Sequence, residues 1–315
     1  MRDPMVVLCP GQGAQVVGMG VAWCGASPAA AEVFARADEV LGDAFGAKLS
    51  TICREGPDDV LNRTDVSQPA LYVCGVASWA GMCERASVSP NDAALLATAG
   101  LSLGEYTALT IAGALEFEDG LRVVQVRGRA MQDAAEAVAS GMVALIGADE
   151  AQAQEVCDEA RGDGVLVCAN FNAPGQVVVS GDKAACERAA SVAADRGFRV
   201  TPLAVAGAFH SPIMRPAAER LAGALSGVGL RAPRCTVMSN VTAEPHAGDD
   251  AASIRARLVE QLTSPVRWSD CARWMAERHG GDGAFVEIAP GKSLAGMMRR
   301  IDRGVKVASH PEPAA

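Results

Sequence analysis

The feature that most constrains the fold is a serine flanked by glycines, placed between an apolar run and a helix-like segment. Residues 93–99 are apolar and suit a buried strand, and residues 105–112 continue as a helix. Between them, Gly100-Leu-Ser-Leu-Gly104 has the small-x-Ser-x-small spacing of a nucleophile elbow, where a strand turns sharply into a helix. The glycines permit the strained turn, and the helix dipole favours negative charge on the oxygen of Ser102. An ordinary tight turn also fits this short pattern, so the pattern alone leaves both interpretations open.

Composition excludes several classes of protein. The 315-residue chain is 50% hydrophobic, but Gly and polar residues interrupt its apolar runs well before membrane-spanning length, so we expect no membrane partner. The first residues lead at once into a strand-like run and predict no export signal. The net charge of -9 disfavours a nucleic-acid partner, because such binding requires clustered Lys and Arg. Ten scattered cysteines without a CxxC pair indicate reduced, buried thiols and a cytoplasmic location.

Two glycine-containing segments resemble nucleotide-binding loops without matching them. Gly11 and Gly13 follow the first strand-like run, but Val16 stands where the dinucleotide fingerprint needs Gly or Ala. The segment beginning at Gly291 ends like a phosphate-binding loop, yet Val286 occupies the position of its first glycine. We therefore expect no bound cofactor, although the first loop can still direct backbone N–H groups toward a ligand.

The order of segments predicts an α/β core that carries an inserted unit. Helix-like patterns cover residues 28–41, 68–86 and 119–139, and short apolar strands cover 235–238, 284–288 and 305–308. This alternation favours a mostly parallel sheet flanked by helices. Between them, the segments 142–146, 150–161, 165–169, 176–180, 183–196 and 198–205 give the βαββαβ order of a ferredoxin-like subdomain. We expect the large domain at 1–140 and 207–315 and the inserted subdomain at 141–206.

Only one of the four histidines has a setting that suggests a general base. His210 lies between an apolar strand end and a Pro-initiated helix, where the inserted unit returns to the main sheet. His246 and His279 lie in glycine-rich loops and are expected to be solvated, and His310 lies in a tail expected to fray. None of the four shows metal-ligand spacing, so we expect no metal.

Six segments together resemble the malonyl-CoA:acyl carrier protein transacylase family. The resemblance covers residues 5–308, with the segments in the order found in that family: 10–15, 100–106, 126–132, 170–181, 207–210 and 287–292. It implies a hydrolase-like α/β core with an inserted ferredoxin-like subdomain. It also implies a ping-pong reaction in which a serine carries the malonyl group as an ester.

The resemblance implies a role for each matching residue. Ser102 corresponds to the nucleophile, His210 to the general base, and Gln261 to the residue whose main-chain carbonyl orients the histidine. No acidic third member is then required. The alternative is that Ser102 is an ordinary turn residue and His210 a structural histidine. The six ordered segments outweigh this alternative.

Substrate recognition follows from the same resemblance. Gln12 and Leu103 would offer backbone N–H groups to the oxyanion, and Arg127 would bind the free malonyl carboxylate through a planar, bidentate guanidinium. Without the resemblance, Arg127 would be interpreted as a solvated cation on a helix. Leu101 departs from the family, which often has histidine before the nucleophile, and Phe209 favours an unbranched acyl group.

The implied function is an [acyl-carrier-protein] S-malonyltransferase of fatty-acid synthesis, with malonyl-CoA as substrate and acyl carrier protein as partner. The carrier is typically acidic, so docking requires a basic patch, and the two candidates are Arg299, Arg300, Arg303 and Lys306, or Arg122 and Arg129. Alternatives are a stand-alone acyltransferase that serves a polyketide synthase, a serine acyl-thioester hydrolase, and a non-catalytic carrier-binding scaffold.

Overall fold

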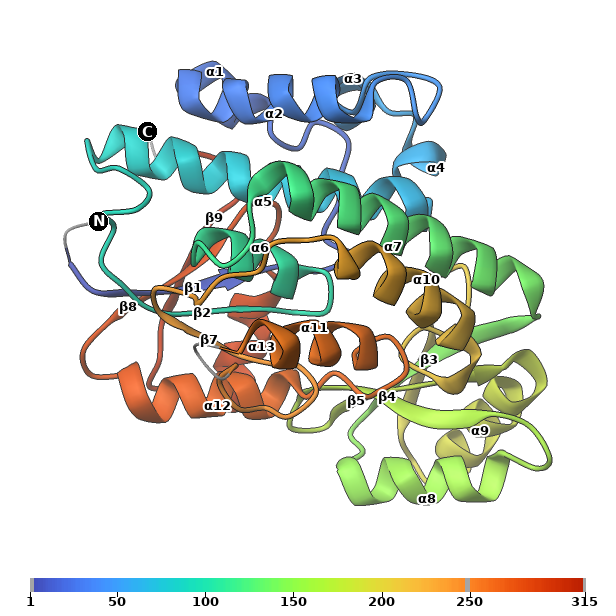
Figure 1. The fold of residues 1–315 in the computed structure, drawn as a ribbon. Coiled ribbons are helices and arrows are strands. Elements are labelled where there is room, and N and C mark those ends of the chain that lie inside the picture. The colour runs from blue at the N-terminus through green and yellow to red at the C-terminus, as the bar shows by residue number, and fades with distance from the viewer. Residues whose placement is uncertain (1–2, 247–249, 314–315) are drawn as a thin grey trace.

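A parallel sheet forms the centre of the larger part of the molecule (Figure 1). The computed structural model describes residues 3–246 and 250–313. The strand order in this sheet is β7-β2-β1-β8-β9, and each neighbouring pair is parallel. The strands are β1 (Met5–Cys9), β2 (Leu95–Gly100), β7 (Thr236–Val237), β8 (Ala284–Ile288) and β9 (Val307–His310). The predicted mostly parallel sheet is confirmed, and His310 lies in β9, not in a frayed tail.

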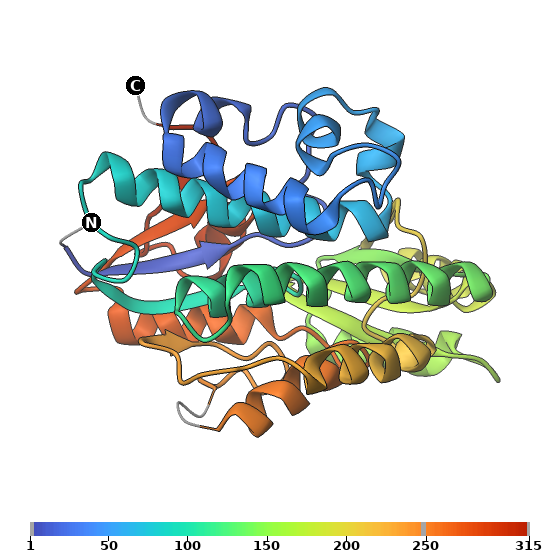
Figure 2. The ribbon, with the colours of Figure 1, turned by 45° about the horizontal axis from the view of Figure 1, so that its top comes forward.

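Helices cover both faces of this sheet, and β1 shows why. Val7 and Cys9 belong to the core on one face, whereas Val6 and Leu8 belong to the core on the other, as expected of a strand buried on both sides. The first face carries α5 (Thr64–Arg85), α6 (Gly104–Ile111) and α7 (Phe117–Ala137). The second carries α12 (Trp268–His279) and α13 (Ser293–Ile301). Figure 2 shows this layered arrangement.

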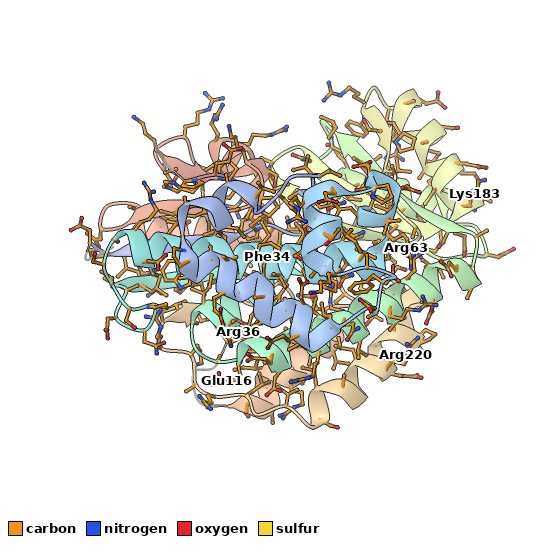
Figure 3. The ribbon with its side chains drawn as sticks, turned by 90° about the horizontal axis from the view of Figure 1, so that it is seen from above. Phe34, Arg36, Arg63, Glu116, Lys183 and Arg220 are labelled. Atoms are coloured by element: carbon orange, nitrogen blue, oxygen red, sulfur yellow. The ribbon has the colours of Figure 1, made fainter. Side chains whose placement is uncertain are left out.

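An outer layer packs on α5 and α7. Its main element is α2 (Pro28–Leu41), which begins with Ser27 as an N-cap and Pro28 in the first turn. Phe34 of α2 is buried in the core, and Arg36 Nε donates to Glu118 Oε1 of α7 at 2.9 Å. Both labelled side chains lie on this layer in Figure 3, which is viewed from above. The remaining elements of the larger part are α1 (Val21–Ala26), α3 (Leu49–Glu55), α4 (Asp58–Leu61), the 3-10 helix η1 (Pro212–Met214), α10 (Arg215–Ser226) and α11 (Ala251–Glu260).

Helix α5 starts earlier than the sequence predicts. The expected start was near Pro69, because proline is common in the first turn, but the helix begins at Thr64 and contains Pro69. Thr64 N donates to Gln132 Oε1 of α7 at 3.0 Å, and every residue from 64 to 79 is buried. Burial therefore outweighs the single hydrogen bond that proline removes.

The second sheet belongs to the ferredoxin-like unit, whose βαββαβ order is confirmed. Its elements are β3 (Ser140–Ile146), α8 (Glu150–Ala160), β4 (Leu166–Ala173), β5 (Gln176–Asp182), α9 (Lys183–Asp195) and β6 (Arg199–Pro202). The strand order is β4-β5-β3-β6, and the pairs are antiparallel. Strand β6 is shorter than the predicted 198–205. The domain boundaries at 140/141 and 206/207 stay predictions.

The two faces of this second sheet have different neighbours. Val143 and Val179 pack with α8 and α9 in a separate core. Met142 and Val178, which point to the opposite face, belong to the main core and line a cavity. The strand alternation therefore places one face of the ferredoxin-like sheet against the larger part, with the cavity at their junction.

Candidate active site

The turn after β2 has the geometry of a nucleophile elbow. Ser102 lies between β2 and α6 with φ of 53°, in the left-handed region that non-glycine residues rarely adopt. A Cβ at Gly100 would lie 1.8 Å from the backbone of Gly104, and a Cβ at Gly104 would lie 2.1 Å from the carbonyl oxygen of Cys9. Both glycines are therefore required by close backbone contact, and the sequence-based interpretation of an elbow describes the local structure.

His210 contacts the hydroxyl of Ser102. The Oγ of Ser102 and the Nε2 of His210 are 2.8 Å apart, although 108 residues separate them in the sequence. His210 Nδ1 lies 2.8 Å from the main-chain oxygen of Gln261. Since a carbonyl only accepts, Nδ1 carries the proton, and Nε2 of the neutral ring accepts from the hydroxyl of Ser102.

Burial keeps this histidine neutral. The pKa of His210 is lowered to about 4, first because the ring is removed from water and second because the positive charge of Arg127 lies nearby. A neutral imidazole can take a proton, whereas an imidazolium cannot. The environment therefore suits His210 to accept a proton from Ser102 at neutral pH.

Arg127 is a buried cation in the same site. Its side chain projects from α7 and is 1% exposed, so the alternative of a solvated helix-face cation is wrong. Nη2 donates to Ser102 Oγ at 3.0 Å and to Gln261 Oε1 at 2.8 Å, and Nη1 donates to Gln68 Oε1 at 2.6 Å. Burial lowers the pKa of the guanidinium. Among the described residues, no carboxylate forms an ion pair with it.

The two residues expected to stabilise an oxyanion both lie near Ser102. Gln12 lines the cavity, and Leu103 follows the serine at the start of α6. Neither main-chain N–H donates a hydrogen bond to any described residue. A Cβ at Gly11 would lie 2.2 Å from the carbonyl oxygen of Leu101, so glycine allows the first loop to lie directly against the elbow. The structure therefore brings Ser102, His210, Arg127, Gln261, Gln12 and Leu103 together.

The cavity has a volume of about 370 Å³ and opens between the larger part and the ferredoxin-like sheet. Apolar side chains from both parts line it: Leu101, Met131, Met142, Val178, Leu203, Val205, Phe209 and Met297. Asn170 and Asn172 of β4 also line it, and Asn172 Oδ1 is buried without a partner among the described residues. The side chain of Leu101 has no hydrogen-bond donor to offer the cavity, unlike the histidine expected at this position from the family resemblance.

Several residues of the site were missed by the sequence analysis. Asn240 Oδ1 accepts from the main-chain N–H of Ser102 at 2.6 Å, and Gln68 holds Arg127. The expectation that His246 is solvated was wrong, because its side chain is fully buried and its Nε2 lies 2.7 Å from Glu105 Oε1. A buried carboxylate provides the partner that the local glycine-containing sequence did not reveal.

The remaining properties of the described residues concern membrane-spanning helices, metal ligands and cysteines. No helix within residues 3–246 and 250–313 combines the length and apolar character needed to cross a membrane. Within the same ranges, no three His, Cys, Asp or Glu side chains are grouped as metal ligands. All ten cysteines are free.

An α/β fold in which an elbow serine and a neutral histidine line one cavity, and a buried arginine donates to that serine, defines a serine acyltransferase. Residues 6–312 match the family described as acyl transferase domain. The malonyl CoA-acyl carrier protein transacylase of Salmonella typhimurium is 39% identical over 307 residues, covering 97% of this chain and 95% of that protein. The chain therefore belongs to the acyl transferase domain family, which confirms the resemblance found in the sequence.

Solved structures support the same family membership. The malonyl-CoA:acyl carrier protein transacylase of Xanthomonas oryzae pv. oryzae has a TM-score of 0.88 and 40% identity, covering 98% of this chain and 95% of that chain. A malonyl-transacylase in complex with a type II polyketide synthase acyl-carrier protein has a TM-score of 0.89 and 36% identity, covering 99% of this chain and 96% of that chain. The predicted fold class is confirmed at the level of the whole chain.

Proposed function

We propose that this chain transfers a malonyl group from coenzyme A to an acyl carrier protein through an ester on Ser102. The observation that carries the proposal is the buried guanidinium of Arg127, 3.0 Å from the hydroxyl of Ser102 and without a carboxylate partner among the described residues. A buried cation of this kind fits an acyl group that ends in a free carboxylate. The names of the relatives and structural neighbours support the same substrate and partner.

The first half-reaction loads the serine. His210 Nε2 takes the proton from Ser102 Oγ, and the oxygen attacks the thioester carbonyl of malonyl-CoA. The main-chain N–H groups of Gln12 and Leu103 donate to the oxyanion, and losing one such donor typically costs about 3 kcal/mol. The C–S bond then breaks, and His210 returns its proton to the departing thiolate of coenzyme A.

The second half-reaction reverses these steps with a different thiol. His210 accepts the proton of the phosphopantetheine thiol of the carrier, and the sulfur attacks the malonyl ester. The C–O bond breaks, and His210 protonates the alkoxide of Ser102. The main-chain carbonyl of Gln261 accepts from His210 Nδ1 throughout and favours the imidazolium that forms in each step.

A transfer assay tests the function directly. Wild-type protein is incubated with malonyl-CoA or acetyl-CoA, its intact mass is measured, and holo carrier proteins of fatty-acid and polyketide type are then added. We expect malonyl to load on Ser102 and to pass to a carrier. Release of free malonate faster than transfer to either carrier would instead favour the hydrolase.

Two proposals remain about the biological setting. We propose fatty-acid synthesis as the pathway, and a polyketide carrier is the alternative because one structural neighbour is complexed with such a carrier. Faster transfer to the polyketide carrier would decide for that alternative. The ten free cysteines, most of them buried, support the proposed cytoplasmic location.

The environment of His210 predicts how kcat/KM for malonyl loading falls at low pH, which is the acidic limb of its pH profile. Its pKa of about 4, compared with 6.5 for an ordinary histidine, means that Nε2 can accept a proton down to about pH 4. We expect kcat/KM for malonyl loading, measured in single-turnover experiments, to fall to half near pH 4. A midpoint near pH 6.5 would contradict the buried base.

The same pKa affects folding, so stability is measured alongside. The unfolded chain protonates His210 below about pH 6.5, and the folded chain does so only below about pH 4. The unfolded state therefore binds more protons between these values, and the contribution of His210 to stability is complete above pH 6.5 and is lost as the pH falls toward 4. Denaturant titrations at each pH separate this loss from the loss of the base.

The basic patch on α13 is the better candidate for carrier docking. In the alternative patch, Arg122 pairs with Asp119 and Arg129 pairs with Asp65 and Asp133. Arg299 and Arg303 are exposed and pair with no carboxylate of the described residues, and α13 also supplies Met297 to the cavity wall. The patch is therefore carried by the helix that also borders the cavity, and by the residues directly after that helix.

Charge reversal tests this surface. We expect Arg299→Glu with Arg303→Glu to raise KM for the carrier about tenfold at low salt, with a smaller effect at high salt. Arg122→Glu is the matched control in the alternative patch. Malonyl loading from coenzyme A is measured separately, so that effects on the first half-reaction are known. A larger effect from Arg122→Glu would place docking on α7.

A further inference from the structure

A carboxylate that the reaction above does not use lies directly behind the nucleophile. Glu105 is the second residue of α6, and its side chain is 1% exposed. Its Oε1 accepts from His246 Nε2 at 2.7 Å. Its Oε2 accepts from Gln261 Nε2 at 2.6 Å and from the main-chain N–H of Asn240 at 3.1 Å. Because a buried carboxylate is costly unless it is hydrogen-bonded, these three donors explain how Glu105 is accommodated.

Gln261 connects Glu105 to the reacting groups. The main-chain oxygen of Gln261 accepts from His210 at 2.8 Å, and its side-chain Oε1 accepts from Arg127 at 2.8 Å. Its Nε2 donates to Glu105 and, at 3.1 Å, to the main-chain oxygen of Ser102. A carboxylate and a carbonyl only accept, and a guanidinium only donates. Only one of the two orientations of this amide therefore satisfies all three side-chain contacts.

Asn240 gives Glu105 a second connection to the elbow. The side chain of Asn240 spans the turn, because its Oδ1 accepts from the N–H of Ser102 at 2.6 Å and its Nδ2 donates to the oxygen of Gly100 at 2.8 Å. Glu105 accepts from the main chain of the same residue. The carboxylate thus holds the segment that supports Ser102 in its left-handed conformation.

We propose that Glu105, held by His246, is a positioning residue that orients Gln261 toward His210 and Arg127. This inference rests on the proposed function of the site. In a Ser-His-Asp triad the carboxylate contacts the histidine itself. Here the carboxylate lies one residue further back, and the carbonyl of Gln261 makes the contact with the histidine. Without Glu105, the Nε2 of Gln261 keeps only its 3.1 Å contact with the main-chain oxygen of Ser102, so the amide is held less firmly against Arg127.

Glu105→Ala is expected to change selectivity as well as rate. We expect kcat/KM for malonyl loading to fall about 100-fold and that for acetyl loading about tenfold, because only malonyl depends on the position of Arg127. Glu187→Ala, on the exposed surface of α9, is the matched control. An equal fall for both acyl groups would mean that Glu105 only supports the fold, and would overturn the proposal.

Glu105→Gln keeps the side-chain volume and gives a spectroscopic result. The N–H of Asn240 can only donate, so the new amide must direct its oxygen to Asn240 and its nitrogen to His246. His246 must then accept at Nε2 and carry its proton on Nδ1. We expect this tautomer change in ¹⁵N NMR spectra, with the malonyl-to-acetyl ratio within about threefold of wild type. An unchanged tautomer, or loss of the ratio, would overturn the assigned network even where the alanine variant does not fold.

A double-mutant cycle tests whether Glu105 acts through Gln261. In a Gln261→Met background the amide is absent, and we expect Glu105→Ala to leave the remaining malonyl-to-acetyl ratio unchanged. The full change of that ratio in this background would show that Glu105 acts by another route. Wild-type loading of malonyl on Ser102 is measured in the same experiment, so failure of the proposed function is distinguished from failure of this inference.

Discussion

Ser102→Ala is expected to lower transfer of malonyl to the carrier by at least about 10⁴-fold. The Oγ of Ser102 is the atom that bonds to malonyl in both half-reactions, and no other hydroxyl lies 2.8 Å from His210 Nε2 among the described residues. The variant keeps the cavity, the oxyanion donors and Arg127, so it retains substrate binding. Single-turnover transfer rates and the intact mass after incubation with malonyl-CoA measure the effect.

The matched control for this variant is Ser191→Ala, which removes an exposed hydroxyl from α9. It should load malonyl as the wild type does. Transfer by Ser102→Ala near the wild-type rate would show direct attack of the carrier thiol on malonyl-CoA. The ping-pong route would then be wrong, although the family would be unchanged.

Arg127→Ala is expected to lower malonyl loading about 10² to 10³-fold and to affect acetyl loading far less. Removing one partner of a buried charge pair typically costs about 3–5 kcal/mol, because the other charge is left uncompensated. The uncompensated charge here is the malonyl carboxylate, and acetyl has none. Competition between malonyl-CoA and acetyl-CoA, followed by mass spectrometry, measures the change in selectivity directly.

Arg122→Ala is the matched control, since Arg122 lies on the same helix but is exposed and paired with Asp119. A second readout is available. The charge of Arg127 lowers the pKa of His210, so its removal should move the acidic limb of the profile upward. Equal losses for malonyl and acetyl, with an unmoved limb, would exclude the proposed role of Arg127.

The sequence predicted those parts of the site that depend on local spacing. Gly100 and Gly104 flank the serine within five residues, and the close contact of Gly100 is with the backbone of Gly104 itself. The segment around His210 was identified by its place between a strand and a Pro-initiated helix. Arg127 required the family resemblance, since nothing in the helical pattern of α7 distinguishes its buried arginine from the exposed ones.

The supporting residues could not be predicted in the same way. Glu105 meets Asn240 and His246 across 135 and 141 residues, and such contacts depend on how the elements pack. His246 looked solvated because its neighbours are turn residues, whereas its side chain is buried and contacts Glu105 of α6. The early start of α5 at Thr64 has a similar cause, since its first residue is held by a side chain of α7.

The junction between the two sheets has an evolutionary consequence. Met142 and Val178 line the cavity from the ferredoxin-like unit, whereas Ser102 and Arg127 come from the other part of the molecule. Substitutions on the cavity-facing side of the ferredoxin-like sheet can therefore reshape the cavity and leave the bond-making groups in place. Part of the cavity wall and the bond-making groups therefore lie on separate structural units, so that part of the wall can diversify while the chemistry is retained.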